Sequence, residues 1–331
     1  MPSKFLCAAL AVALNVAAQA APDKMQAAEV GPGGVLSVQT RPVPQPGVGE
    51  VLIKVRAAGV NPVDWKAAKR RFGMVPGTDV SGVIDTLGAG VTDWKVGDQV
   101  LGFARQSGGY AEYAVIPVSS LAKKPKSMTF EEAAGVPIAA ETAYRALHEI
   151  GNVQKGQTVL IHGAAGGVGS AAVQIAKAAG ARVIGTASAN NHDYLRSLGA
   201  DQAIDYRSQK FEDAVKDVDL VLNTVDADTN ARSIAIVRPG GMLVSIVGPA
   251  NAAACALARI RCARPERETG ASNAELLAHV VALADAGKFK VFVEETYSLA
   301  DAGLAWQKSR TGHTRGKLII KVSAGPTMKH Q

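Results

Sequence analysis

One glycine-rich segment has the spacing of a phosphate-binding turn: Ile161-His162-Gly163-Ala164-Ala165-Gly166-Gly167-Val168-Gly169. It lies where an apolar strand gives way to a helical pattern. Glycines at such a junction allow a tight turn, let the backbone approach a pyrophosphate and permit close packing of helix on strand. The free N–H groups of the helix N-terminus attract anions. Taken alone, the run fits a structural turn, but its strand-turn-helix context predicts a dinucleotide site.

The expected cofactor contacts follow from this motif. Ala164 takes the first position of the G-x-G-x-x-G pattern, and Gly166 and Gly169 take the other two. We expect two further contacts at the ends of later strands, Asn223 and Val247. The loop contacts are expected from Gly163, Ala165, Gly166, Gly167, Val168 and Gly169.

The strand that follows the glycines ends without the acid that selects NAD. That acid normally binds the ribose 2′-hydroxyl about 20 residues past the glycines. Here the strand ends at Ala187-Ser188, and the first acid is Asp193, inside the next helix. Hydrogen-bond donors and a cation could hold a 2′-phosphate instead, or the polar residues could simply cap the helix. The sequence therefore predicts NADPH. The candidate phosphate ligands are Ser188, Asn190, Asn191, Arg315 and Lys317.

Apolar strands alternate with helical segments around these residues. Such alternation predicts right-handed βαβ units and a doubly wound parallel sheet. The expected strands are Thr158–His162, Arg182–Ala187, Val218–Asn223 and Met242–Val247.

The flanking regions have a different character. From Val35 to Val118 the chain is strand-rich and punctuated by glycine and proline, which predicts short β-strands joined by turns. Helical patterns follow at Phe130–Ala134 and Ala139–Glu149, and a longer one lies near Ala274–Ala286. Two late strand-like pieces could rejoin the first domain. They are Phe289–Val293 and Lys317–Val322.

With these features the chain resembles the zinc-independent quinone oxidoreductases of the medium-chain dehydrogenase/reductase superfamily. The similarity runs in the family's order from about Met25 to Val322. It rests on the glycine-rich loop and on Gly49–Val55, Ala58–Lys66, Pro76–Gly82, Gly108–Tyr113, Leu198–Asp201 and Arg315–Lys317.

The resemblance implies an α/β architecture in which a Rossmann domain is inserted in a GroES-like, mostly-β domain. The GroES-like domain is expected over 25–140 with a return segment over 288–322, and the Rossmann domain over 141–287. Cofactor and substrate are then expected in the cleft between them, with Tyr206 against the adenosine 2′-phosphate. The family also implies a homodimer.

The resemblance disfavours a metal. Zinc-dependent relatives carry a ligand Cys where Asn61 stands and a His-Glu pair where Thr78-Asp79 stands. The first domain contains no cysteine and no histidine before His148, whereas a catalytic zinc needs three protein ligands. A conjugated acceptor, a quinone or an α,β-unsaturated ketone, needs only donors for the enolate oxygen.

Family position places four side chains near the nicotinamide. We predict Lys66 as the enolate-side donor, with Asn61 and Thr142 positioning cofactor and substrate and Asp64 beside them; without the resemblance, Lys66 would be a surface lysine. The loop over 67–75 is shorter than is typical of relatives, which reshapes one wall of the pocket. The alternatives are an enoyl-thioester reductase and a non-catalytic NADPH-binding protein.

Composition and the N-terminus bound the remaining possibilities. The net charge of +7 suits an anionic small molecule, and because the basic residues are spread out, nucleic acid is not the expected partner.

The N-terminus has a signal-peptide pattern over 1–20, which consists of Lys4, the apolar run Phe5–Ala18 and the small-residue site Ala18-Gln19-Ala20. The apolar run is too short for a membrane span. The sequence thus predicts export; the alternative is a cytoplasmic protein starting at Met25. Cys255 and Cys262 form either a disulfide or two free thiols.

Overall fold

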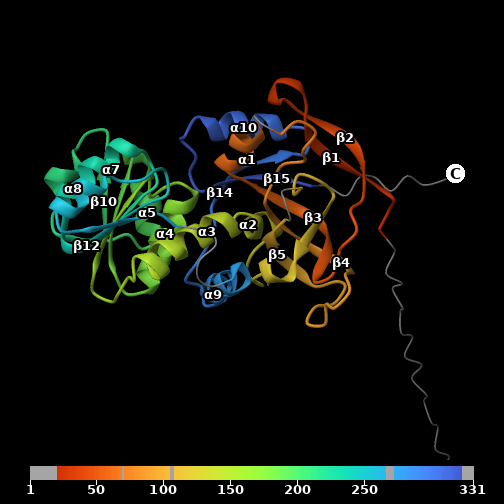
Figure 1. Ribbon diagram of the computed structural model, residues 1–331, viewed down its shortest axis with the longest axis horizontal. Helices are drawn as coiled ribbons and strands as arrows, with labels where there is room; N and C mark the ends of the chain where they lie inside the picture. Colours follow the sequence, from red (N-terminus) through yellow and green to blue (C-terminus); the bar gives the residue numbers. More distant parts are fainter. Residues whose placement is uncertain (1–20, 69–70, 105–107, 266–271, 323–331) are drawn as a thin grey trace, which may run out of the picture.

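Two sheets lie side by side in the computed structural model, each at the centre of one lobe (Figure 1). The structure describes residues 21–68, 71–104, 108–265 and 272–322. The predicted signal peptide, residues 1–20, lies outside these ranges. Among the helices described, none has the length and apolar character needed to cross a membrane.

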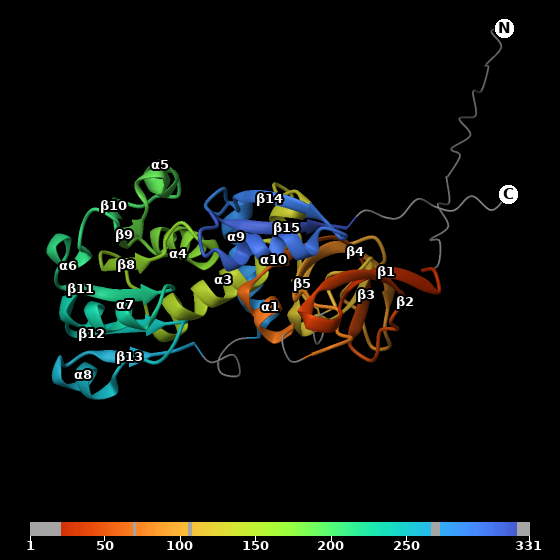
Figure 2. The ribbon, with the colours of Figure 1, turned by 90° about the horizontal axis from the view of Figure 1, so that it is seen from above.

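The first lobe contains a six-stranded parallel sheet with the order β10-β9-β8-β11-β12-β13, which Figure 2 shows from one edge to the other. The chain therefore reverses direction across the sheet between β8 and β11, and ligands bind at such a switch point in doubly wound folds. The predicted fold is confirmed. The strands are β8 (Thr158–His162), β9 (Arg182–Ala187), β10 (Gln202–Asp205), β11 (Val218–Asn223), β12 (Val237–Ser245) and β13 (Arg261–Ala263). Their connecting helices are α4 (Gly167–Ala178), α5 (His192–Ser197), α6 (Phe211–Ala214), α7 (Ala227–Ser233) and α8 (Ala252–Leu257).

The second lobe is built on a seven-stranded, mostly antiparallel sheet in the order β14-β15-β3-β4-β5-β7, with β6 paired to β3. Strand β15 pairs with β3, so the C-terminal segment does return to the first part of the chain, as predicted. The strands are β3 (Glu50–Val60), β4 (Asp79–Leu87), β5 (Gln99–Phe103), β6 (Tyr113–Pro117), β7 (Leu121–Lys123), β14 (Val293–Ser298) and β15 (Lys317–Lys321). A separate hairpin of β1 (Lys24–Val30) and β2 (Leu36–Pro42) and the helices α1 (Pro62–Ala68), α2 (Phe130–Ala134) and α10 (Ala302–Arg310) complete this lobe.

The lobes are joined by a helix that belongs to both. Helix α3 (Pro137–Tyr144) runs on as a π-helix over Arg145–Ile150 and packs against α4 and α9 (Asn273–Asp285). Helix α9 also packs on β7, so one hydrophobic core is continuous from Leu101 of β5 to Leu277 of α9 and into the parallel sheet. The domain boundary expected between 140 and 141 falls inside α3.

The expected strand Phe289–Val293 is wrong, because β14 begins only at Val293. Phe289 is buried in the shared core. The backbone of Lys290 donates to Gln174 Oε1 (2.8 Å) and accepts from Gln174 Nε2 (3.0 Å). A side chain of α4 thus satisfies the groups that a neighbouring strand would otherwise bind.

The two cysteines that the sequence left undecided form a disulfide in the structure. The bond links Cys255 of α8 to Cys262 of the edge strand β13. It therefore fastens the last helix of the parallel-sheet lobe to the strand beside it.

Candidate cofactor and active site

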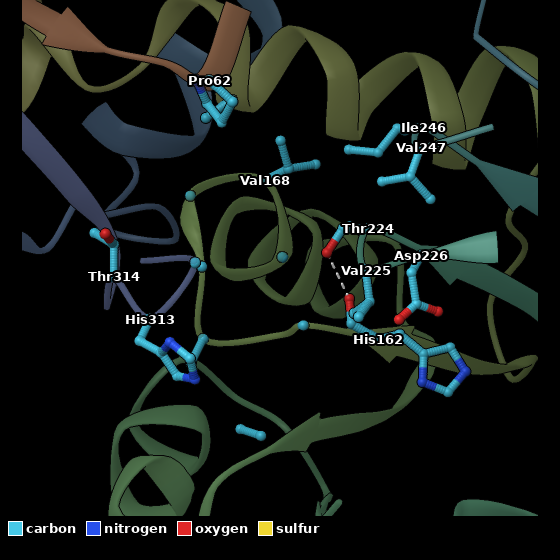
Figure 3. Close-up of a pocket in the computed structure, with 18 of the residues that line it drawn as sticks. Pro62, His162, Val168, Thr224, Val225, Asp226, Ile246, Val247, His313 and Thr314 are labelled. Carbon is cyan, nitrogen blue, oxygen red and sulfur yellow. Dashed lines mark hydrogen bonds between the residues drawn. The ribbon is translucent and has the colours of Figure 1, made fainter. Parts of the chain in front are cut away.

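A cavity of about 1190 Å³ opens between the two lobes. Figure 3 shows Pro62 and Thr314 from one lobe and Thr224, Ile246 and Val247 from the other around the same opening. Ligand pockets are usually about 300–1,000 Å³, so this cavity has room for a dinucleotide together with a second small molecule. The domain interface and the switch point of the parallel sheet thus coincide, as the resemblance implied.

The glycine-rich loop forms one wall of this cavity. Gly163 turns the chain with a φ of +66°, and the N–H of Ala164 donates to the carbonyl of Thr186 (3.0 Å). Gly166 caps α4, and Gly166 to Gly169 line the cavity, so the first-turn N–H groups, which have no partner within the helix, form the kind of site that binds anions. A Cβ on Gly169 would lie 2.2 Å from the carbonyl oxygen of Gly163. The start of α4 therefore packs directly on the turn that follows β8, at the place where the glycines were expected to permit close packing of helix on strand.

The second lobe reaches across to this loop. The N–H of Gly316 donates to the carbonyl of Ala165 (2.8 Å), so the segment before β15 lies directly against the loop. A Cβ on Gly167 would lie 3.1 Å from Cδ of Lys317. The cofactor wall is thus built from both domains.

The polar turn after β9 is held by a cation from the other lobe. Asn191 donates to Oγ of Ser188 (3.1 Å), Arg315 Nε donates to Asn191 Oδ1 (2.7 Å), and Arg315 Nη2 donates to the carbonyl of Asn190 (3.1 Å). All four residues line the cavity. Because its charge is turned toward this polar corner, Arg315 is placed to meet an anion there.

No carboxylate of the turn after β9 lines the cavity, but Glu294 of β14 does, and its Oε2 accepts from the backbone N–H of Arg315 (3.1 Å). Tyr206 lines the wall, half-exposed, with the guanidinium of Arg207 5.8 Å from its ring centre. Asp193 does not line the cavity, and its exposed carboxylate binds Arg196 (2.7 Å). Among the described residues, the turn at the end of β9 thus contributes polar side chains and no carboxylate to the cavity.

Lys317 does not reach the polar turn, contrary to our expectation. Its side chain is 5% exposed, and its ammonium donates to Asn61 Oδ1 (2.6 Å) and to the carbonyl of Val60 (3.3 Å), with Asp79 Oδ2 at 3.6 Å. Gly316, which lies between the two cations just before β15, has a φ of +62°, so the backbone turns there and Arg315 and Lys317 point to different places. Arg315 is the predicted cation that binds the turn.

Asn223 also lies elsewhere than expected. It is fully buried and does not line the cavity. Its amide nitrogen donates to the carbonyl of Asp226 (2.6 Å) and to Asn230 (2.7 Å), and its oxygen accepts from the N–H of Val225 (2.9 Å). Asn223 therefore shapes the loop that follows β11, whereas Val247, at the end of β12, does line the cavity.

The predicted catalytic side chains come together in part. Asn61, Lys66 and Thr142 all line the cavity. The ammonium of Lys66 lies at the exposed rim, 5.4 Å from the ring centre of Trp65. Asp64 lies behind the wall, where its Oδ2 accepts from the backbone N–H of Asn61 (2.8 Å) and the hydroxyl of Tyr110 (3.1 Å).

Burial controls the titration of two groups at the site. Desolvation raises the pKa of Asp64 to about 7, against the lowering effect of the Asn61 N–H. His162 lies buried between Thr186 Oγ1 (3.3 Å) and Ser233 Oγ (3.0 Å), and desolvation, helped by the charge of Arg232, lowers its pKa to about 4. Sequence reasoning did not assign a site role to His162, although it is the last strand residue before the glycine loop.

Asp79 is the second residue whose importance the spacing did not reveal. It is fully buried, and its Oδ1 accepts from the N–H of Ile138 at the start of α3 (3.1 Å).

Within the described ranges, no group of three His, Cys, Asp or Glu side chains is placed to hold a metal ion.

Comparisons with known proteins identify the family. The family models for the alcohol dehydrogenase GroES-like domain and for zinc-binding dehydrogenase match residues 47–126 and 198–320. A chloroplastic quinone-oxidoreductase of Triphysaria versicolor is 33% identical over 313 residues, which cover 88% of this chain and 95% of the relative. The chain belongs to the quinone oxidoreductase-like group of the medium-chain dehydrogenase/reductase superfamily.

Two further relatives of this superfamily member extend the comparison. A chloroplastic NADPH-dependent alkenal/one oxidoreductase of Arabidopsis thaliana is 32% identical and covers 93% of this chain and 82% of its own length. A mycobacterial protein solved in complex with NADPH superimposes with a TM-score of 0.81 at 33% identity and covers 90% of this chain and 99% of its own. The chain is therefore an oxidoreductase of this superfamily, and its predicted fold is confirmed.

Two glycines of the loop should separate folding from cofactor binding. In Gly169→Ala the new Cβ meets backbone at 2.2 Å, so we expect a loss of about 1–3 kcal/mol of stability. In Gly166→Ala the Cβ lies 3.4 Å from the nearest atom, so only the smaller cost of replacing a glycine N-cap is expected, while a nicotinamide dinucleotide should bind more weakly because the backbone must approach its pyrophosphate. Thermal denaturation of both variants and NADPH titration of Gly166→Ala measure this; equal melting temperatures would contradict the packing argument.

Asp64 and His162 should make the free energy of unfolding depend on pH in opposite directions. The pKa of His162 is about 4 in the folded protein, compared with an ordinary value of 6.5. Its contribution to the free energy of unfolding is therefore lost as the pH falls from 6.5 toward 4. The pKa of Asp64 is about 7 against 3.8, so its contribution is full below 3.8 and is lost as pH rises to 7. In Asp64→Asn the opposing slope is removed, and His162 alone should then contribute a rise in stability of up to roughly 3 kcal/mol between pH 4 and 6.5. Urea unfolding across this range tests it; a flat profile for the variant rejects the assignment.

Proposed function

We propose that this chain is a zinc-independent, NADPH-dependent oxidoreductase that transfers a hydride to a conjugated carbonyl acceptor, a quinone or an α,β-unsaturated ketone. One observation carries the proposal: a single cavity joins an acid-free polar turn holding Arg315 to a wall where Asn61 and Thr142 present hydrogen-bonding side chains. The relatives named above act on acceptors of this class. The first end suits a phosphorylated cofactor and the second an acceptor oxygen.

The protein's part in the reaction is to bind, aim and stabilise. NADPH, when bound, supplies the hydride. The first-turn N–H groups of α4 would bind its pyrophosphate, and Arg315, Ser188 and Tyr206 its 2′-phosphate. Asn61 and Thr142 would face the acceptor, where fixed donors stabilise the oxygen that gains negative charge. A conjugated acceptor spreads this charge, so the donors can replace a Lewis acid.

The decisive experiment is NADPH oxidation by the purified protein against quinones, simple enones and an enoyl thioester, with and without a chelator. We expect turnover of quinones or enones that survives chelation. Preference for the thioester would favour the enoyl reductase, and tight NADPH binding without turnover would favour a non-catalytic role. Zinc that is lost together with activity would reject zinc independence. Light scattering on the same sample tests the expected homodimer.

The cofactor preference should depend on the charge at the polar turn. We expect tighter binding of NADPH than of NADH, and Ser188→Asp should narrow the difference by a like-charge penalty of order 1 kcal/mol. Asp193→Asn is the matched control, because this exposed carboxylate lies outside the cavity and binds Arg196. Fluorescence titration of both cofactors measures the effect. NADH binding as tightly as NADPH to the wild type would remove the claim.

Lys66 should contribute to the rate of hydride transfer more than to cofactor affinity. Loss of a donor to a developing oxyanion costs about 10²–10³ in rate at a dry site, and because Lys66 lies at the exposed rim, we expect a loss nearer tenfold. Single-turnover rates of Lys66→Ala at saturating NADPH test this. A rate within about threefold of wild type, under 1 kcal/mol, would leave Lys66 as a surface lysine.

We also propose that the protein is exported. The signal-peptide pattern of residues 1–20 motivates this, and the Cys255–Cys262 disulfide suits an oxidising compartment. Mature protein from the native host should begin near Ala21 or Pro22 and show no free thiol when denatured without a reductant. N-terminal sequencing that finds Met1 or Met25 would place the protein in the cytoplasm instead.

A further inference from the structure

A buried ammonium lies against the acceptor end of the cavity wall. Lys317 Nζ is 2.6 Å from Asn61 Oδ1, 3.3 Å from the carbonyl oxygen of Val60 and 3.6 Å from Asp79 Oδ2. Both charged side chains are almost completely removed from water, with 5% of Lys317 and none of Asp79 exposed. Hydrogen bonds made by charged groups in such surroundings are short and strong. Nothing in the proposed chemistry so far uses this ammonium.

The charges on its two sides determine how the amide of Asn61 is oriented. Oδ1 faces the ammonium of Lys317, and Nδ2 donates to the carboxylate of Asp79 (2.9 Å). A flipped amide would set its NH₂ group against an ammonium and its oxygen against a carboxylate. One of the two orientations is therefore strongly favoured, and Lys317 and Asp79 select it together.

This orientation leaves one donor for the cavity. A side-chain amide carries two N–H donors, and among the described residues Asn61 Nδ2 makes one hydrogen bond, to Asp79. Asn61 is 4% exposed and lines the cavity. The second N–H is thus the group that it can offer to an acceptor oxygen or to the cofactor carboxamide.

The same lysine is located by the cofactor loop. Its neighbour Gly316 donates to the carbonyl of Ala165, and its Cδ lies 3.1 Å from the place of a Cβ on Gly167. A side chain longer than hydrogen at 167 would displace the lysine stem. The position of the ammonium, and with it that of the Asn61 amide, is therefore fixed relative to the loop that holds the dinucleotide.

We propose that Lys317 is a positioning residue for hydride transfer, which fixes the side-chain amide of Asn61 so that its free N–H faces the reacting atoms. This inference rests on the proposed function, because it assigns Asn61 a partner in that reaction. The competing role is structural: Lys317 would merely neutralise the buried carboxylate of Asp79. The two roles differ in whether the effect of Lys317 passes through Asn61.

A double-mutant cycle of Lys317→Met and Asn61→Ala tests that difference. A misplaced group of this kind costs up to about 10²-fold, so each single variant should lower the single-turnover rate by about 10- to 100-fold, with the NADPH dissociation constant within about threefold of wild type. The double variant should be no more than about twofold slower than the slower single variant. Losses that multiply would show that Lys317 acts independently of Asn61 and would overturn the proposal.

The double variant Lys317→Met/Asp79→Asn removes both buried charges. It separates the proposed positioning of Asn61 from a purely structural role of Lys317. It can also be measured if Lys317→Met alone does not fold. The side-chain amide that replaces the carboxylate can still accept from Ile138, but its NH₂ group would face Asn61 and invert that amide. We expect the melting temperature to recover toward wild type while the rate stays at least about tenfold low. Recovery of the rate together with stability would establish the structural role and reject ours.

A readout that does not need turnover keeps this inference separate from the proposed function. The side-chain NH₂ of Asn61 should give two distinct ¹H–¹⁵N NMR signals with slow hydrogen exchange in the wild type, and faster exchange in Lys317→Met. Unchanged exchange would reject the fixed amide even if quinones are reduced. If no acceptor is reduced by the wild type, the proposed function fails, and retained slow exchange would still establish the lysine-held amide.

Discussion

The placement of the two lobes depends on one fully buried carboxylate. Asp79 of β4 accepts from the N–H of Ile138 at the start of α3 and from the amide of Asn61, and it lies beside the ammonium of Lys317 on β15. Burying an ion costs several kcal/mol, which only a full set of hydrogen bonds offsets. Four chain segments must therefore stay in register around Asp79. This requirement holds the shared helix α3, and so the parallel-sheet lobe, against the antiparallel one.

Because the Rossmann domain is inserted in the other domain, the same arrangement brings the segment before β15 next to the glycine-rich loop. Because β15 pairs with β3, the segment just before β15 must pass the glycine-rich loop, where Gly316 binds Ala165. Arg315 then extends to Asn190 and Asn191, at the end of β9. A 2′-phosphate bound at this turn would touch both lobes at once. Binding of such a cofactor would therefore couple its affinity to the placement of the two lobes.

Local sequence patterns predicted what local forces decide. The glycine loop, the strands β8, β9 and β11 and helix α9 follow from periodicity and turn chemistry. Strand β12 begins at Val237 and ends at Ser245, not at the expected Met242 and Val247, and the short strands β10 and β13 were not predicted. The errors occur where distant groups compete. Phe289–Val293 has strand-like residues, but Gln174 takes its backbone hydrogen bonds. Lys317 has the charge to bind a phosphate, but its ammonium instead contacts Asp79 and Asn61, and neither of these partners is near it in sequence.

Two neutral side chains of the cavity wall, Asn61 and Thr142, lie on segments that buried ion pairs hold in place. Thr142 lies on α3, and the buried guanidinium of Arg145 ties that helix to Glu141, to Glu149 and to Asn273 of α9. Catalytic donors stabilise a developing charge most when they need no reorganisation as it forms. A long, exposed side chain such as that of Lys66 must lose rotamer freedom in order to stabilise the same charge. In the proposed reaction, the burial of this wall therefore favours the amide of Asn61 and the hydroxyl of Thr142 as the main stabilisers of the acceptor oxygen.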